Sequence, residues 1–175
     1  MILVRKISRL LFYPTRFAAW IIFIVLIYSI LLLILSKVNP SWDLPVHISG
    51  NKFEIFFPFT STKFLLGDYT AAYLATNLAA VTFYGCFIGL LSSIFKSFSK
   101  PKLFTASGVI QLTRFYISNL AFPFIFLALL IIYGEEIMNV AQVIVLHLII
   151  GVFAFFMAAI FKQGLILQEE QDLTF

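Results

Sequence analysis

Few side chains in this sequence could perform chemistry, and their spacing does not bring them together. The two histidines, His47 and His147, lie far apart in the chain. Cys86 is the only cysteine, which excludes an intramolecular disulfide, a zinc cluster or a CxxC redox pair. No HExxH, GxSxG or phosphate-binding glycine motif is present. The sequence therefore predicts a protein that is not an enzyme and that binds no metal or cofactor.

Some acidic residues could in principle hold a cation, but we interpret them as scattered, solvated charges: Asp43, Glu54, Asp68, Glu135 and Glu136.

Three polar residues fall inside long apolar segments, where a polar or ionisable group is costly in lipid. His147 is accompanied there by no Asp, Glu, Lys or Arg, so a proton relay lacks its second member. We expect a neutral histidine that is hydrogen-bonded to a neighbouring helix through a Tyr, Asn or Ser side chain. Asn119 and Gln142 are interpreted in the same way, as interhelical hydrogen-bonding groups. The alternative places His147 along a transport path.

Small residues recur every fourth position in two of the apolar segments. Gly85, Gly89 and Ser93 form one such row, and Ala154 and Ala158 form a weaker one. Small side chains let two helices approach closely in a membrane. We expect packing within the helix bundle, and the alternative is homo-oligomerisation through the glycine face.

The amino-acid composition predicts that the segments carrying these residues lie in a membrane. Of the 175 residues, 62% are hydrophobic, 22 are Phe and only 11% are charged, whereas a soluble domain has about 25% charged residues. A soluble core could not hide so much apolar surface. No segment is polar enough to form a separate soluble domain, so the chain is interpreted as one integral membrane domain, 1–175, in contact with the lipid bilayer.

The apolar runs predict an all-α fold, a bundle of four transmembrane helices at 17–36, 71–95, 112–133 and 137–161. Glu135 and Glu136 are expected to form a tight turn between the last two. The outer loop, 37–70, has alternating apolar residues on either side of Gly50 and Asn51, which predicts a small extracytoplasmic β-hairpin. The tail is 162–175.

Basic residues set the expected orientation. The proposed inner segments hold most of the Lys and Arg residues: Arg5, Lys6, Arg9, Arg16, Lys96, Lys100, Lys102, Arg114 and Lys162. The positive-inside rule then places both termini in the cytoplasm. The net charge of +4 is expected to favour contact with the anionic cytoplasmic leaflet. Direct binding of nucleic acid is not expected.

The tail combines acidic and apolar residues, which is unfavourable for binding an anionic membrane surface. Its spacing alone leaves two alternatives open: a frayed helix end in solvent, or a contact with another protein. The segment AAIFKQGLILQEEQDLT resembles the closing signature, IFxxGxxLxEExDLT, of the YoaS-like bacterial membrane proteins, a four-span family of unknown function. The signature positions are Ile160, Phe161, Gly164, Leu167, Glu169, Glu170, Asp172, Leu173 and Thr174. The segment 104–122 is also similar, whereas the first half matches only in span layout.

The resemblance implies a location in the bacterial inner membrane. Members are often encoded beside a very small helix-turn-helix regulator, which implies a membrane protein that holds or senses for a transcription factor. The expected partner-binding residues lie in the tail: Gly164, Leu167, Glu169, Glu170, Asp172, Leu173 and Thr174. The alternative is an accessory subunit of a membrane transport, export or immunity complex.

Overall fold

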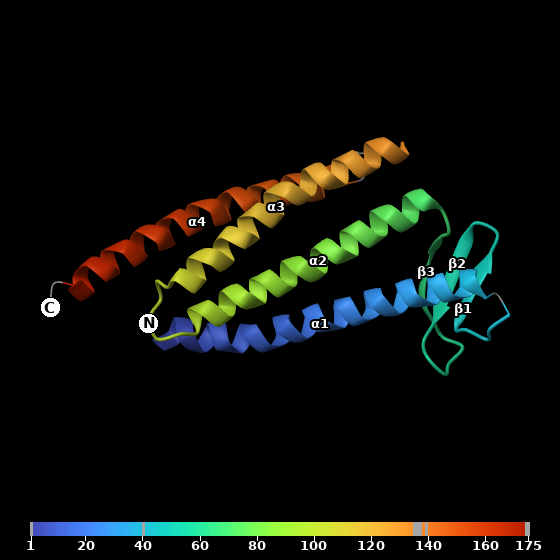
Figure 1. Ribbon diagram of the computed structural model, residues 1–175, viewed down its shortest axis with the longest axis horizontal. Coiled ribbons are helices and arrows are strands. Elements are labelled where there is room, and N and C mark those ends of the chain that lie inside the picture. Colours follow the sequence, from blue (N-terminus) through green and yellow to red (C-terminus); the bar gives the residue numbers. More distant parts are fainter. Residues whose placement is uncertain (1, 40, 135–137, 139, 174–175) are drawn as a thin grey trace.

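The computed structural model describes residues 2–39, 41–134, 138 and 140–173, and it contains four long helices and a small sheet (Figure 1). The helices are α1 (Ile2–Val38), α2 (Ala71–Phe98), α3 (Ala106–Tyr133) and α4 (Ala141–Leu173). The strands between α1 and α2 are β1 (Val46–Ser49), β2 (Lys52–Phe56) and β3 (Lys63–Asp68). All four helices are long and apolar enough to cross a membrane, as expected of a multi-pass membrane protein.

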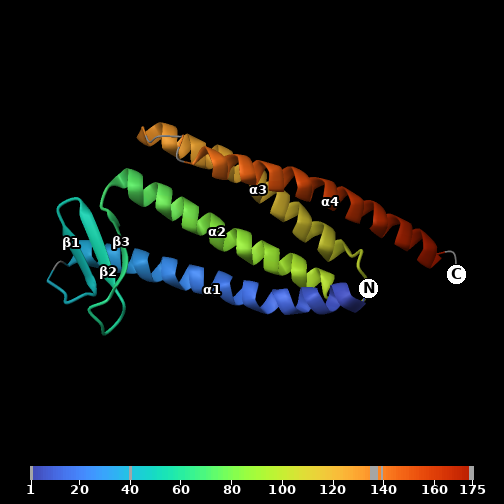
Figure 2. The same ribbon diagram turned by 180° about the vertical axis from the view of Figure 1, so that it is seen from behind.

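The helices pack in the order of the sequence. α1 packs against α2, α2 against α3 and α3 against α4, and in the part of the chain that the structure describes α1 and α4 form no extensive contact. Both termini lie at one end of the molecule and the sheet lies at the other (Figures 1 and 2). The main apolar core lies between α2, α3 and α4 and includes Ile94, Leu112, Phe115, Ala154, Ala158 and Phe161.

The helices extend beyond the predicted membrane spans. α1 begins at Ile2, so the basic N-terminal residues belong to the same helix as the first apolar run. Pro14 lies within it and is exposed, and the next hydroxyl, Thr15 Oγ1, donates to the Leu11 carbonyl at 2.7 Å. α3 begins at Ala106, where Thr105 caps the helix by accepting from Gly108 N. α4 continues to Leu173, so most of the tail is helical.

The segment between α1 and α2 contains a three-stranded antiparallel sheet where the sequence predicted a two-stranded hairpin. β1 and β2 are joined at Gly50 and Asn51, with Gly50 at a φ of 57°. β3 pairs with the other edge of β2. Its sequence, KFLLGD, does not alternate between apolar and polar residues, which is why it carried no strand signal. Phe53 and Ile55 of β2 are buried in the apolar cluster that joins the sheet to α1 and α2.

Some predictions fall on residues outside the described part of the chain. These are the tight turn at Glu135 and Glu136, the start of the fourth span at Ile137, and the contact assigned to Thr174.

Candidate functional site

The C-terminal end of α4 projects past the ends of the other helices (Figures 1 and 2). Its inner face is anchored by aromatic packing. Phe161 stacks on Phe98 with ring centroids 5.0 Å apart, and it meets the Phe104 ring edge-on at 5.2 Å. A Cβ atom at Gly164 would lie 2.6 Å from the Phe104 ring, so only glycine fits this approach. Gly164, which the sequence placed in a partner contact, therefore packs within the chain.

An ion pair also ties the tail to the rest of the molecule. Lys102 Nζ, in the segment that connects α2 to α3, donates to Asp172 Oδ2 of α4 at 2.8 Å. Both side chains are largely exposed, and exposed pairs of this kind contribute about 0–1 kcal/mol. Asp172, also predicted as a partner contact, thus has an intramolecular neighbour and lies on the inner side of the tail.

The outward face of the same helix end combines apolar and acidic side chains. Ile166, Glu169, Glu170 and Leu173 follow the spacing i, i+3, i+4 and i+7, which places them on one face of a helix. All four are exposed, and the exposed fraction of Leu173 reaches 87%. We call these four residues the C-terminal stripe. Leu167 is also exposed, but its position places it on a different face of the helix.

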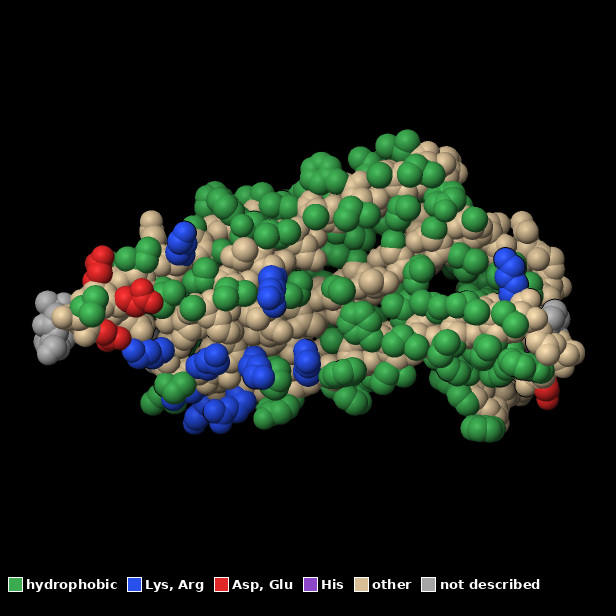
Figure 3. Space-filling model, viewed as in Figure 1, with side chains coloured by type: hydrophobic (Ala, Val, Ile, Leu, Met, Phe, Trp, Pro, Cys, Tyr) green, Lys and Arg blue, Asp and Glu red, His purple; other side chains and the backbone are tan. Residues whose placement is uncertain are grey.

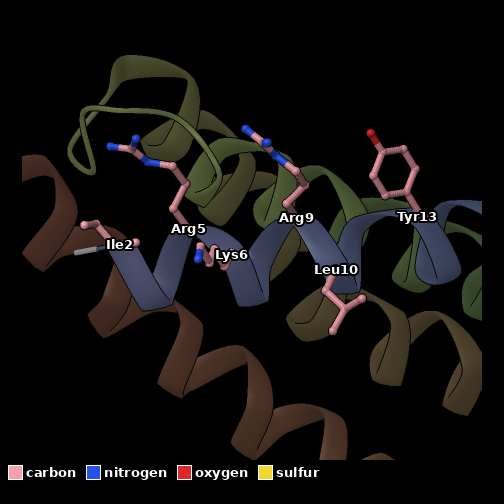
Figure 4. Close-up of a pocket in the computed structure, with 6 residues that line it drawn as sticks. All are labelled: Ile2, Arg5, Lys6, Arg9, Leu10 and Tyr13. Carbon is pink, nitrogen blue, oxygen red and sulfur yellow. The ribbon is translucent and has the colours of Figure 1, made fainter.

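The opposite charge gathers on α1 at the same end of the molecule. Lys and Arg side chains form a row over the first turns of α1, while acidic side chains lie at the end of α4 (Figure 3). Arg5, Lys6, Arg9 and Tyr13 line a surface depression, and Arg5, Arg9 and Tyr13 extend to the same side of the helix (Figure 4). Arg5 Nη2 donates to the Pro101 carbonyl at 3.2 Å, which fixes the start of α1 to the α2–α3 connection.

A buried polar cluster joins the three helices α2, α3 and α4. Asn119 Nδ2 donates to the Phe115 carbonyl at 2.8 Å, so its Oδ1 faces His147 as an acceptor. His147 Nδ1 therefore donates to Asn119 Oδ1 at 2.9 Å. His147 Nε2 lies at the longer distance of 3.5 Å from Tyr84 Oη, which donates to it when the histidine is neutral. Both ring nitrogens therefore have a partner.

Aromatic rings close the cluster off. Phe83, Phe87 and Phe122 each meet the His147 ring edge-on, the nearest at a centroid distance of 4.8 Å from Phe83. His147 is only 2% exposed and Asn119 is fully buried. Gln142 differs from its expectation: it is exposed, and the described residues offer it no hydrogen-bond partner. The cluster is suited to joining helices, because its polar groups satisfy one another inside an apolar shell.

The row of small residues on α2 lies against α1 of the same chain. A Cβ atom at Gly85 would lie 3.0 Å from the Phe23 ring, and one at Gly89 would lie 3.9 Å from Ala19 Cβ. Ser93 Oγ donates to the Gly89 carbonyl within its own helix at 3.0 Å. The face is therefore occupied by packing within the chain.

The α3–α4 contact uses Ala154 and Ala158, both buried, together with a glycine that the sequence did not single out. A Cβ atom at Gly151 would lie 2.7 Å from Leu120 Cδ2. An isolated glycine in a long apolar run gave no signal of this approach, because the facing residue depends on the register of α3 against α4.

No family model, curated protein or solved structure matches the chain. The resemblance of its C-terminal segment to the YoaS-like proteins therefore stays a prediction. Within the described ranges, no group of three or more His, Cys, Asp and Glu side chains could hold a metal ion.

Proposed function

We propose that this chain is a non-enzymatic regulatory or accessory protein of the bacterial inner membrane that holds a cytoplasmic partner through the C-terminal stripe. The observation that supports this proposal is the stripe itself: two apolar side chains, Ile166 and Leu173, flank Glu169 and Glu170 on the exposed face of a projecting helix end. An amphipathic helix face of this kind is a common protein-docking element, with anchors at i, i+3, i+4 and i+7.

The charge distribution supports a cytoplasmic position for this end. The first turns of α1 and the α2–α3 connection carry a cluster of Lys and Arg at the end of the molecule where both termini lie. Segments with this excess of basic residues stay on the cytoplasmic side of a membrane. Both termini, and the C-terminal stripe with them, then face the cytoplasm.

The chemistry of the stripe defines the partner. Glu169 and Glu170 are complementary to a basic surface, and the exposed Leu173 requires an apolar patch beside it. A small helix-turn-helix regulator, the partner that the family resemblance implies, has a basic surface for DNA phosphates. The stripe and DNA would compete for that surface, so capture at the membrane would keep the regulator off its operator.

A crosslinking pull-down from native membranes tests this proposal. Deleting 168–175, or the single change Leu173→Ser, should abolish recovery of a small basic DNA-binding protein while the chain stays in the membrane. Leu167→Ser is the matched control, because Leu167 is an equally apolar, exposed residue on another face. Equal recovery with Leu173→Ser and Leu167→Ser would contradict the proposal.

A role as a transport, export or immunity accessory has weaker support. His147 would be its natural pathway residue, but aromatic rings surround it and Asn119 and Tyr84 satisfy its nitrogens. His147→Ala separates the two functions: loss of a transported flux from a folded protein would favour transport, and an unchanged flux would favour recruitment.

A further inference from the structure

α1 and α2 lie close together at the end where α1 begins and α2 ends, and they diverge toward the sheet (Figure 1). The close approach is set by Gly85, where the Phe23 ring lies against the glycine backbone. Toward the other end, the buried β2 residues Phe53 and Ile55 pack with side chains of both helices. The sheet therefore lies between the diverging ends of the two helices. The space between the sheet and the glycine contact is open.

That space is an apolar groove with a volume of about 390 Å³. It lies within the size range of small-molecule sites, roughly 300–1,000 Å³. The space-filling view shows the hollow between α1 and α2 beside the sheet (Figure 3). Its walls and end are formed by aliphatic side chains of three elements, among them Val25, Ile30, Leu33, Leu65, Leu78 and Val81.

The few polar groups of the groove favour an anion. Lys37, in the last turn of α1, is the one charged residue that lines the groove, and no acidic residue does. The other polar lining residues are neutral: Ser29, Tyr69, Tyr73 and Asn77. No carboxylate pairs with Lys37 within the described ranges, whereas Lys63 and Lys102 each have an acidic partner. A single unpaired cation beside an apolar trough is complementary to a molecule with an anionic head and a hydrocarbon chain.

We propose that this groove holds one acyl chain of an anionic phospholipid, with the lipid phosphate on Lys37. The groove runs along the segments of α1 and α2 that are apolar enough to cross a membrane, where acyl chains are the abundant apolar molecules. A lysine near a helix end keeps its stem on apolar surface and its ammonium group at the headgroup level. The lipid then fills the gap that the sheet leaves between the two helices. This inference is independent of the proposed recruitment, because the groove lies at the opposite end of the molecule from the C-terminal stripe.

Native mass spectrometry of the full-length chain tests this site. The protein is released from nanodiscs that contain phosphatidylglycerol and phosphatidylcholine in equal amounts, and the retained lipids are counted. We expect one phosphatidylglycerol to be retained in preference to phosphatidylcholine. Lys37→Gln should lower that preference about fivefold, since one basic residue near a lipid surface contributes about 1 kcal/mol. Lys52→Gln, on an exposed part of β2 outside the groove, should leave it unchanged.

Filling the groove gives a second, independent test. Ser29→Phe should remove the retained lipid, and Ala121→Phe, on an exposed position of α3, should not. If circular dichroism shows that Ser29→Phe does not fold, Val81→Phe fills the same space from the α2 wall. Equal retention of the two lipids, an unchanged preference in Lys37→Gln, or retention by a folded, groove-filled variant would each overturn the proposal.

Discussion

The hydrogen bond between His147 and Asn119 should hold α4 to α3, and its contribution can be worked out from the structure. His147→Ala removes the 2.9 Å bond to Asn119 Oδ1, and interhelical hydrogen bonds in membrane proteins contribute on average about 0.6 kcal/mol, with a maximum of about 1.7 kcal/mol. It also removes a ring that meets Phe83 edge-on at 4.8 Å, a contact of about 0.5–1.5 kcal/mol. A cavity remains because the site is 2% exposed. The free energy of unfolding should fall by about 2–4 kcal/mol.

A double-mutant cycle isolates the hydrogen bond from the cavity. His147→Ala, Asn119→Ala and the double variant are unfolded in mixed micelles by increasing SDS, with helicity followed by circular dichroism. The coupling energy should be about 0.6–1.7 kcal/mol. Gln142→Ala is the control, since this exposed polar residue of the same helix should change the unfolding free energy by less than about 0.5 kcal/mol. Additive single changes, or a His147→Ala variant as stable as the Gln142→Ala variant, would refute this account of the cluster.

Three further perturbations test the packing of the helices. Gly151→Leu should separate α3 from α4, because even a Cβ atom added there would lie 2.7 Å from Leu120 Cδ2; SDS unfolding should show a loss of several kcal/mol, and wild-type stability would exclude the close approach. Gly164→Leu should displace the end of α4 from the Phe104 ring and raise hydrogen exchange in 164–173, whereas unchanged exchange would mean that the tail is held in another way. Lys102→Gln removes an exposed ion pair and should lower the unfolding free energy by less than about 1 kcal/mol; a larger loss would show that the pair is shielded from solvent.

The number and approximate positions of the helices could be predicted from the sequence, because apolar runs of this length are a direct signal. The helix that carries the first predicted span, 17–36, begins earlier, at Ile2. Nothing in 2–16 other than Pro14 opposes a helix that continues into the apolar run. The third strand could not be predicted, because Phe64, Leu65 and Leu66 are consecutive apolar residues and no alternation marks a strand.

The candidate site could be predicted only in part. The mixture of acidic and apolar residues in the tail indicated a possible protein contact, but it did not predict which of these residues face outward. That division depends on α4 continuing as a helix against Phe104, which turns Gly164 and Asp172 inward and the C-terminal stripe outward. Likewise, a lone histidine in an apolar run predicted a hydrogen bond to a Tyr, Asn or Ser side chain of a neighbouring helix. The identity of Asn119 followed only from the register of the two helices.

Site-specific photocrosslinking in living cells tests the recruitment account most directly. A photoreactive amino acid is placed at position 173, on the C-terminal stripe, and in a separate chain at position 165, which lies on the half-buried inner side of the tail. The account predicts that position 173 forms a crosslink to a small, basic cytoplasmic DNA-binding protein, that Glu169→Lys removes this crosslink, and that position 165 forms none. A crosslink from both positions alike, or from position 173 only to lipid or to extracytoplasmic proteins, would contradict it.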